Sequence, residues 1–141
     1  MTEVEAKKFL AVDAQPTYFI GWSVLEHKQS DWTGFNPKQV NLYQSPRQQN
    51  GGLSGLDLQK ELASALILNG NVLDYLLSQP RIIPEEWECK KIFFAGTVYQ
   101  NCHGDYFIRY LIGCRHNWFW GYQNLEDKIS ADSYVAIGFC P

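Results

Sequence analysis

The thiols and imidazoles are the side chains of this 141-residue chain best suited to bind a metal or to exchange disulfides. The sequence holds three histidines and four cysteines, namely Cys89, Cys102, Cys114 and Cys140. No Cys-x-x-Cys pair occurs, which excludes the zinc-ribbon and thioredoxin motifs. Cys102-His103 and Cys114-x-His116 have the composition of a zinc site, but the strand expected between them separates the two pairs by more than about 25 Å. Zinc ligands converge within a few ångströms, so we do not expect this quartet to form a site as long as the strand between the two pairs is present.

A second grouping, Cys89 with Cys114 and His116, fits better. If Gln100 lies opposite Asp105 in a hairpin, Cys89 comes near His116 and onto the same face as Cys114. The trio is therefore a weak candidate for a metal site or a disulfide, and the alternative is a set of ordinary thiols at the end of a sheet. We expect reduced thiols, because disulfides are rare in the cytoplasm.

Arg109 is the charge that most needs an explanation. It lies in the middle of an expected strand among apolar neighbours, where an unpaired charge is costly. Three outcomes are open: the side chain reaches a sheet edge, it pairs with an acid, or it binds an anionic ligand or partner.

No sequence motif predicts catalysis. The patterns G-x-S-x-G, H-E-x-x-H and S-x-x-K are absent. The glycines of residues 51–55 precede a helix but lack the Lys-Ser/Thr of a phosphate-binding loop. We leave an enzymatic activity open, favour a non-enzyme, and predict no cofactor.

The aromatic side chains supply the main candidate surface. Aromatic residues make up 15% of the chain, and ten of them lie between Phe93 and Tyr122, in an expected three-stranded meander of residues 90–100, 105–112 and 118–123. Tyr and Trp combine a flat apolar body with a polar group, which suits recognition of proteins or sugar rings. The alternative is that the N-terminal strand and loop bury this face. The candidate binding residues are Tyr99, Tyr106, Arg109, Tyr110, Trp118, Trp120 and Tyr122, of which all but Arg109 are expected on one face. The opposite, core face is expected to carry Ile92, Phe94, Val98, Phe107, Leu111 and Phe119, with Arg109 as its odd member.

Further elements must position this meander. We expect strands at 17–25, 38–44 and 133–139, and a mobile loop at about 44–55. Ser54 begins a helix with Asp57 as its capping-box partner, Asn69-Gly70 ends it, and Asn71 caps a second short helix. The sequence thus predicts a single α+β domain, residues 1–141, whose antiparallel sheet packs on one face against the helix pair of 54–79.

Charge and hydropathy exclude two kinds of partner. The net charge of −3 disfavours binding to nucleic acid, because a protein that binds nucleic acid needs a surplus of Lys and Arg. No run approaches the about 20 apolar residues of a membrane span, and the first ten residues do not resemble a signal peptide. We expect a cytoplasmic protein.

Part of the chain resembles a group of short uncharacterised bacterial proteins. The likeness rests on Asn69-Gly-Asn-Val-Leu-Asp-Tyr-Leu-Leu, on Ile83-Pro-Glu-Glu-Trp87 and on Ile92-Phe-Phe-Ala-Gly-Thr-Val-Tyr99. The resemblance implies a bacterial, cytoplasmic origin and a helix-then-meander order, and it implies no activity.

The sequence therefore favours a small non-enzymatic binding module that contacts a partner protein or a second copy of itself through the aromatic sheet face. The alternative is a binder of, or enzyme for, a small ligand or carbohydrate at that same face.

Overall fold

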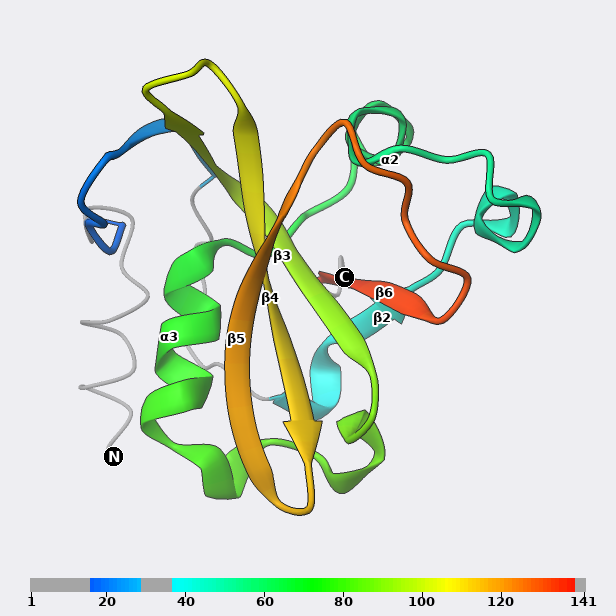
Figure 1. Ribbon diagram of the computed structural model, residues 1–141. Coiled ribbons are helices and arrows are strands. Elements are labelled where there is room, and N and C mark those ends of the chain that lie inside the picture. The colour runs from blue at the N-terminus through cyan, green and yellow to red at the C-terminus, as the bar shows by residue number, and fades with distance from the viewer. Residues whose placement is uncertain (1–15, 29–36, 139–141) are drawn as a thin grey trace.

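The computed structural model describes residues 16–28 and 37–138, which form six strands and two α-helices (Figure 1). The strands are β1 (Trp22–His27), β2 (Asn41–Tyr43), β3 (Lys91–Asn101), β4 (Tyr106–Cys114), β5 (Asn117–Asn124) and β6 (Ser133–Ile137). The helices are α2 (Gly55–Glu61) and α3 (Gly70–Ser78), and short 3-10 helices occupy Pro37–Gln39, Pro46–Asn50, Pro80–Ile82 and Glu85–Trp87.

All six strands belong to one sheet. Its order is β2-β6-β3-β4-β5, and β1 pairs with β3 beside this path. Every pairing is antiparallel except that of β3 with β6, which is parallel. The α+β class and the β3-β4-β5 meander are confirmed.

The long strand β3 pairs with different strands along its length, so the sheet divides into two branches at a point that we call the fork. Its first residues, Lys91–Phe93, pair with β6, whereas its second half pairs with β1. The chain between the helices passes through this fork: the Leu68 N–H donates to the Ala136 carbonyl at 3.1 Å, and the Gly96 N–H donates to the Leu68 carbonyl at 2.9 Å. A Cβ at Gly96 would lie 2.8 Å from the Ile67 carbonyl oxygen, so this crossing requires glycine.

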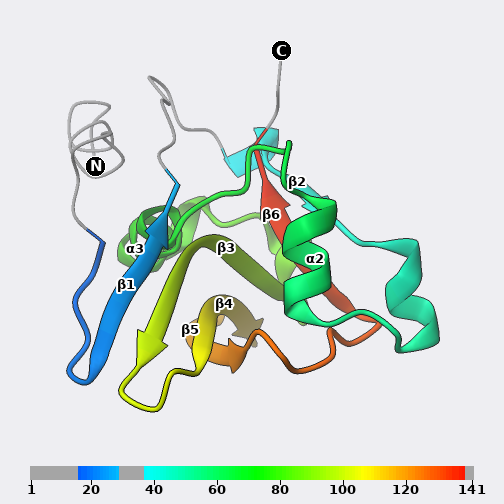
Figure 2. The same ribbon diagram turned by 90° about the horizontal axis from the view of Figure 1, so that it is seen from above.

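The crossing places the two helices on opposite faces of the sheet. Figures 1 and 2 show β3 lying between α2 and α3. The sequence predicted both helices on one face, but residues 62–69 leave the helix and cross the sheet instead. Asn69 consequently does not end the first helix; its side chain accepts hydrogen bonds from the Asn71 and Val72 N–H groups and caps α3.

Each face has its own hydrophobic core. The α3 face buries, among others, Leu68, Val72, Leu73, Leu76, Trp87, Ile92, Phe94 and Leu111. The α2 face buries Leu53, Leu58, Leu62, Phe93, Val98, Ile108, Leu125 and Ile129, among others. Both faces of the central strands are therefore covered, which explains why β3 is buried along almost its whole length.

The segment at 44–55, predicted to be mobile, is held by specific contacts. Ser45 caps the 3-10 helix that begins at Pro46. The buried Gln48 side chain donates to the Ser130 and Ser133 carbonyls, each at 2.9 Å. Leu53 is fully buried. These contacts favour an ordered segment.

Candidate functional site

The register of the meander differs from the predicted one by one residue beside each turn, and by two residues in the first half of β3, where Phe94 lies opposite Arg109 rather than Leu111. Gln100 lies opposite Tyr106 rather than Asp105, and Tyr110 lies opposite Gly121 rather than Trp120. The first difference arises because five residues, 101–105, separate Gln100 from Tyr106, where the prediction had four. A further register shift between Phe94 and Tyr99, where β3 bends at the fork, moves Tyr99 to the face opposite Phe93. The difference at the second turn arises because a two-residue turn closes the β4–β5 hairpin.

This difference divides the seven candidate residues between the two faces. Tyr99, Trp118, Trp120 and Tyr122 join Arg109 on the α3 face, as the pairs Tyr99–Phe107, Gly113–Trp118, Leu111–Trp120 and Arg109–Tyr122 show. Tyr106 and Tyr110 pack against the core of the α2 face. The single Tyr/Trp face that the sequence predicted is therefore not formed, and Phe107 moves into the aromatic group.

Arg109 has a structural partner. Its guanidinium is 2% exposed and makes a bidentate ion pair with Asp74 of α3, with N–O distances of 3.0 and 2.7 Å. The guanidinium carbon also lies 4.2 Å from the ring centroid of Trp120 and 4.9 Å from that of Phe19. Of the three outcomes that the sequence left open, the structure shows pairing with an acid.

The aromatic rings around Arg109 bring four strands together. Trp22 of β1 stacks on Phe107 of β4 at 5.3 Å and meets Tyr122 of β5 edge-on at 4.9 Å. Phe19 contacts Tyr99 at 5.5 Å and Trp120 at 5.0 Å. We call this set the aromatic cluster: Phe19, Trp22, Tyr99, Phe107, Trp120 and Tyr122. Its formation means that the sheet curls until β1 and β5 share contacts.

Tyr99 is the most buried member of the aromatic cluster, at 1% exposure. Its hydroxyl donates to the Thr17 carbonyl at 3.0 Å. Burial raises the pKa of Tyr99. The charge of Arg109 partly opposes this effect, and the charge of Asp74 adds to it. The Tyr99 hydroxyl thus acts as a neutral hydrogen-bond donor that holds Thr17 next to the Arg109–Asp74 ion pair.

The sequence did not identify Asp74, Phe19 and Trp22 as parts of this site. The carboxylate lies on a helix surface, and the two rings lie in the predicted N-terminal strand region. No local pattern joins them to Arg109, because all three contacts arise from tertiary packing.

Strand β5 presents the exposed part of this region. Phe119, Trp120 and Tyr122 are 57%, 38% and 54% exposed, and Ile112 opposite Phe119 is also partly exposed. Within residues 16–28 and 37–138, β5 pairs only with β4, so its other edge carries free backbone groups. The segment Asn117–Asn124 contains no charged residue and no proline.

The predicted Cys89, Cys114 and His116 grouping lies at the end of the β4–β5 hairpin. The Cys89 N–H donates to the Gly113 carbonyl at 3.0 Å, and the Glu88 carboxylate accepts from the His116 N–H at 2.5 Å. Cys89 and Cys114 are exposed free thiols. Among the residues that the structure describes, no group of three or more His, Cys, Asp or Glu side chains is arranged to hold a metal ion. Cys140 lies outside the described residues.

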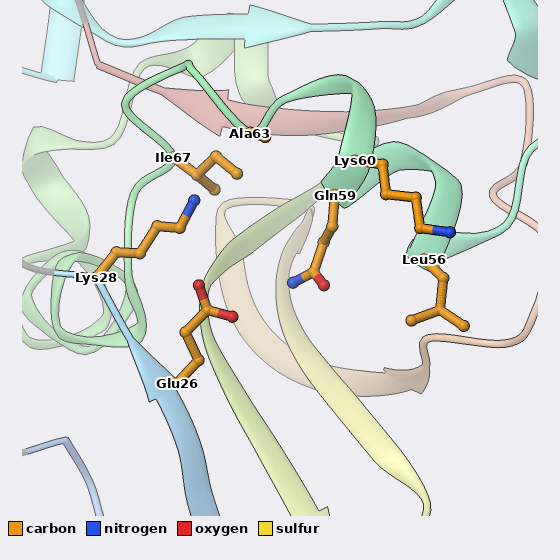
Figure 3. Close-up of a pocket in the computed structure, with 7 residues that line it drawn as sticks. All are labelled: Glu26, Lys28, Leu56, Gln59, Lys60, Ala63 and Ile67. Carbon is orange, nitrogen blue, oxygen red and sulfur yellow. The ribbon is translucent and has the colours of Figure 1, made fainter.

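A separate pocket of about 290 Å³ lies between β1 and α2 (Figure 3). Figure 3 shows Glu26 of β1 and Lys28, the residue that follows β1, on one side of the pocket, whereas Lys60 of α2 points away from them. Leu56, Gln59, Ala63 and Ile67 complete its lining. None of the residues that the sequence singled out lines this pocket.

Comparisons with known proteins add no functional information. No protein-family model, no curated protein and no solved structure matches the chain. No helix in the described part of the chain is long and apolar enough to cross a membrane.

Proposed function

We propose that the chain is a protein-binding module whose contact surface is the free edge of β5, and that its partner is a second copy of the chain. The observation that carries this proposal is the combination, in one strand, of an uncharged free edge with three exposed aromatic side chains. The proposal involves no catalytic step and no cofactor. The resemblance to short bacterial proteins supports a bacterial, cytoplasmic setting, which stays a prediction.

Comparison of the free sheet edges supports the choice of β5. Proteins protect free edges with short strands, bulges and charges. Strand β2 is three residues long, and β1 has a register shift between Val24 and Glu26 and carries the Glu26 charge. Strand β5 is eight residues long, pairs with β4 without a register shift, and carries no charge. Among the described strands it is therefore the edge most suited to pair with another chain.

The sequence of β5 is compatible with pairing to itself. An antiparallel pair related by a two-fold axis normal to the sheet joins residues that point to the same face. With Trp120 on the axis, Trp118 of each copy lies opposite Tyr122 of the other, and aromatic pairs of this kind stabilise sheets. Like charges are never opposed, because β5 has none. A second copy therefore supplies complementary backbone groups and complementary rings at once.

The alternative function, a small-ligand or carbohydrate site at the Tyr/Trp face, receives less support. Such a site requires that one ligand can contact the Arg109 guanidinium and the Tyr and Trp rings at the same time. Arg109 is buried and engaged by Asp74, and the pocket between β1 and α2 contains none of those side chains.

Sedimentation equilibrium of the full chain over a range of concentrations tests the proposal. We expect a monomer–dimer equilibrium for the parent protein, and a dimer dissociation constant at least about tenfold higher for Phe119→Lys, because a lysine must then be buried at the edge. The matched control is Leu25→Lys, which changes a side chain of similar exposure, 55%, on the protected edge of β1. We expect this control to dimerise like the parent.

Two outcomes contradict the proposal. One is a parent protein that is monomeric at every concentration. The other is a dimer that Leu25→Lys weakens as much as Phe119→Lys. Circular dichroism of both variants checks that the fold is retained, which we expect because both substitutions change exposed side chains.

A further inference from the structure

We propose that Cys89 and Cys114 are a thiol pair that forms a reversible intramolecular disulfide by exchange with a low-molecular-weight disulfide such as oxidised glutathione. This inference does not depend on the proposed function, since it concerns the thiols beside the β4–β5 turn and uses different residues.

The backbone brings the two cysteines close to each other. The β3–β4 ladder ends at the pair of Ile92 with Leu111. Before it, the turn that holds Cys89 stays beside the end of β4, where Gly113 directly precedes Cys114. The hydrogen bond of 3.0 Å from the Cys89 N–H to the Gly113 carbonyl fixes this approach. With standard bond lengths, it limits the separation of the Cα atoms of residues 89 and 114 to about 7 Å. Disulfides span Cα separations of about 4.4–6.8 Å, so a small adjustment brings the sulfurs into range.

The conformation of Cys89 is a second, independent observation. Residues 87–90 form a type II turn, in which the Lys90 N–H donates to the Trp87 carbonyl at 3.2 Å and Glu88 has φ −59° and ψ 146°. Cys89 occupies the third position with φ 63°, a conformation that favours glycine. A strained residue at a position where glycine would fold more easily points to a role for its side chain.

The surroundings of Cys114 are strained in the same way. Arg115 and His116, which follow it in the hairpin turn, have φ values of 52° and 66°. Such a turn normally uses Asn and Gly. The three non-glycine residues with positive φ among those described are thus Cys89, Arg115 and His116, and all of them adjoin the proposed thiol pair.

Both thiols are accessible to a small oxidant. Cys89 and Cys114 are exposed, as is Cys102, which lies in the turn at the opposite end of β3 and β4. Exposure therefore does not distinguish the three thiols, but proximity does. Cys102 is the natural internal control.

The exchange balances in two steps. The thiolate of one cysteine attacks the small disulfide RSSR, forms a protein–SR mixed disulfide and releases one RSH. The thiolate of the second cysteine then attacks the protein sulfur of that mixed disulfide, forms the Cys89–Cys114 bond and releases the second RSH. Two cysteine thiols are oxidised, and one RSSR is reduced to two RSH.

Incubation of the full chain in glutathione redox buffers, followed by acid quenching, alkylation and peptide mass spectrometry, tests this proposal. For the parent and for Cys102→Ser we expect a cross-linked peptide pair containing Cys89 and Cys114, lighter by two hydrogen atoms and reversed by dithiothreitol. For Cys89→Ser and for Cys114→Ser we expect complete loss of this pair and glutathione attached to the remaining thiol.

The proposal is overturned if the parent accumulates only mixed disulfides with glutathione at Cys89 and Cys114. A cross-link that instead joins Cys102 or Cys140 to another cysteine also overturns it. We expect both serine variants to fold, since serine tolerates the same backbone conformations as cysteine. If one of them fails to fold, the other still tests whether loss of one thiol abolishes the cross-link.

Discussion

At the scale of single residues, the Arg109–Asp74 pair shows how a buried charge organises its surroundings. The guanidinium is almost fully buried, and its Nε atom has no hydrogen-bond partner in the structure. The carboxylate of α3 is therefore its main compensation, aided by the rings of Trp120 and Phe19. The pair fixes α3 against β4 at the place where the sheet curls.

Asp74→Asn is expected to destabilise the fold by about 3 kcal/mol, because removing one partner leaves a buried charge without compensation. The measurement is the free energy of unfolding from urea titration. The double variant Asp74→Leu with Arg109→Met removes both charges, and we expect it to be more stable than Asp74→Asn. A double variant less stable than Asp74→Asn would contradict this account.

Cys89→Gly is expected to stabilise the protein by about 1 kcal/mol in reducing buffer, because glycine adopts a positive φ without the steric cost that cysteine bears. The matched control is Cys102→Gly, which replaces an exposed cysteine that lacks a positive φ. We expect that control to be neutral or destabilising. Thermal unfolding of the two variants checks the difference, and equal shifts would show that Cys89 bears no strain.

At the scale of elements, the N-terminus of α3 is tied to two strands through one threonine. The Thr97 hydroxyl accepts from the Gly70 N–H at 2.8 Å and lies 2.8 Å from His27 Nδ1. Burial lowers the pKa of His27 below its ordinary value of 6.5. Protonation of His27 is therefore opposed in the folded state.

The stability contribution of His27 is expected to be present above pH 6.5 and to be lost as the pH falls through the folded-state pKa. The unfolded chain binds the proton more readily, so acidification favours unfolding. Urea titrations at several pH values below 7 check this dependence. His27→Gln should flatten it, whereas His103→Gln, which changes an exposed histidine, should leave it unchanged.

Local signals predicted several elements correctly. The capping box of Ser54 and Asp57 forms as expected, and the helix-then-meander order is present. Asn69-Gly70, by contrast, was interpreted as the end of a helix and proves to be the start of one. Asn-Gly suits either role locally, and the decision is made by hydrogen bonds from residues 66–69 to β3 and β6.

Register was the least predictable property of the elements. An alternating strand pattern defines two faces but does not show which residue faces which across a turn. The two-residue Arg115–His116 turn lacks the Asn-Gly signal that reveals such turns, and the shift in β3 depends on a chain segment far away in sequence. The candidate residues were therefore drawn from the correct strands but assigned in part to the wrong faces.

At the scale of the whole molecule, the α+β class followed from the segregation of helical and strand-like patterns. The arrangement of the two layers did not, because nothing in residues 62–69 indicates that they cross a sheet. The aromatic abundance of the meander has two uses in the structure: it fills the cluster around Arg109 and it covers the free edge of β5.

The passage of residues 66–69 through the fork has a consequence for the order of folding. Leu68 bonds to Gly96 and to Ala136, so the crossing is complete only when segments far apart in the chain have met. The loop-closure entropy of such contacts is lost before they return any stabilisation, which slows folding. We therefore expect the local β3-β4-β5 meander to form first, and β6, together with β2, to close over the crossing chain last. Until that closure neither core is complete, because β6 supplies Ala136 to the core of the α3 face and Val135 to the core of the α2 face.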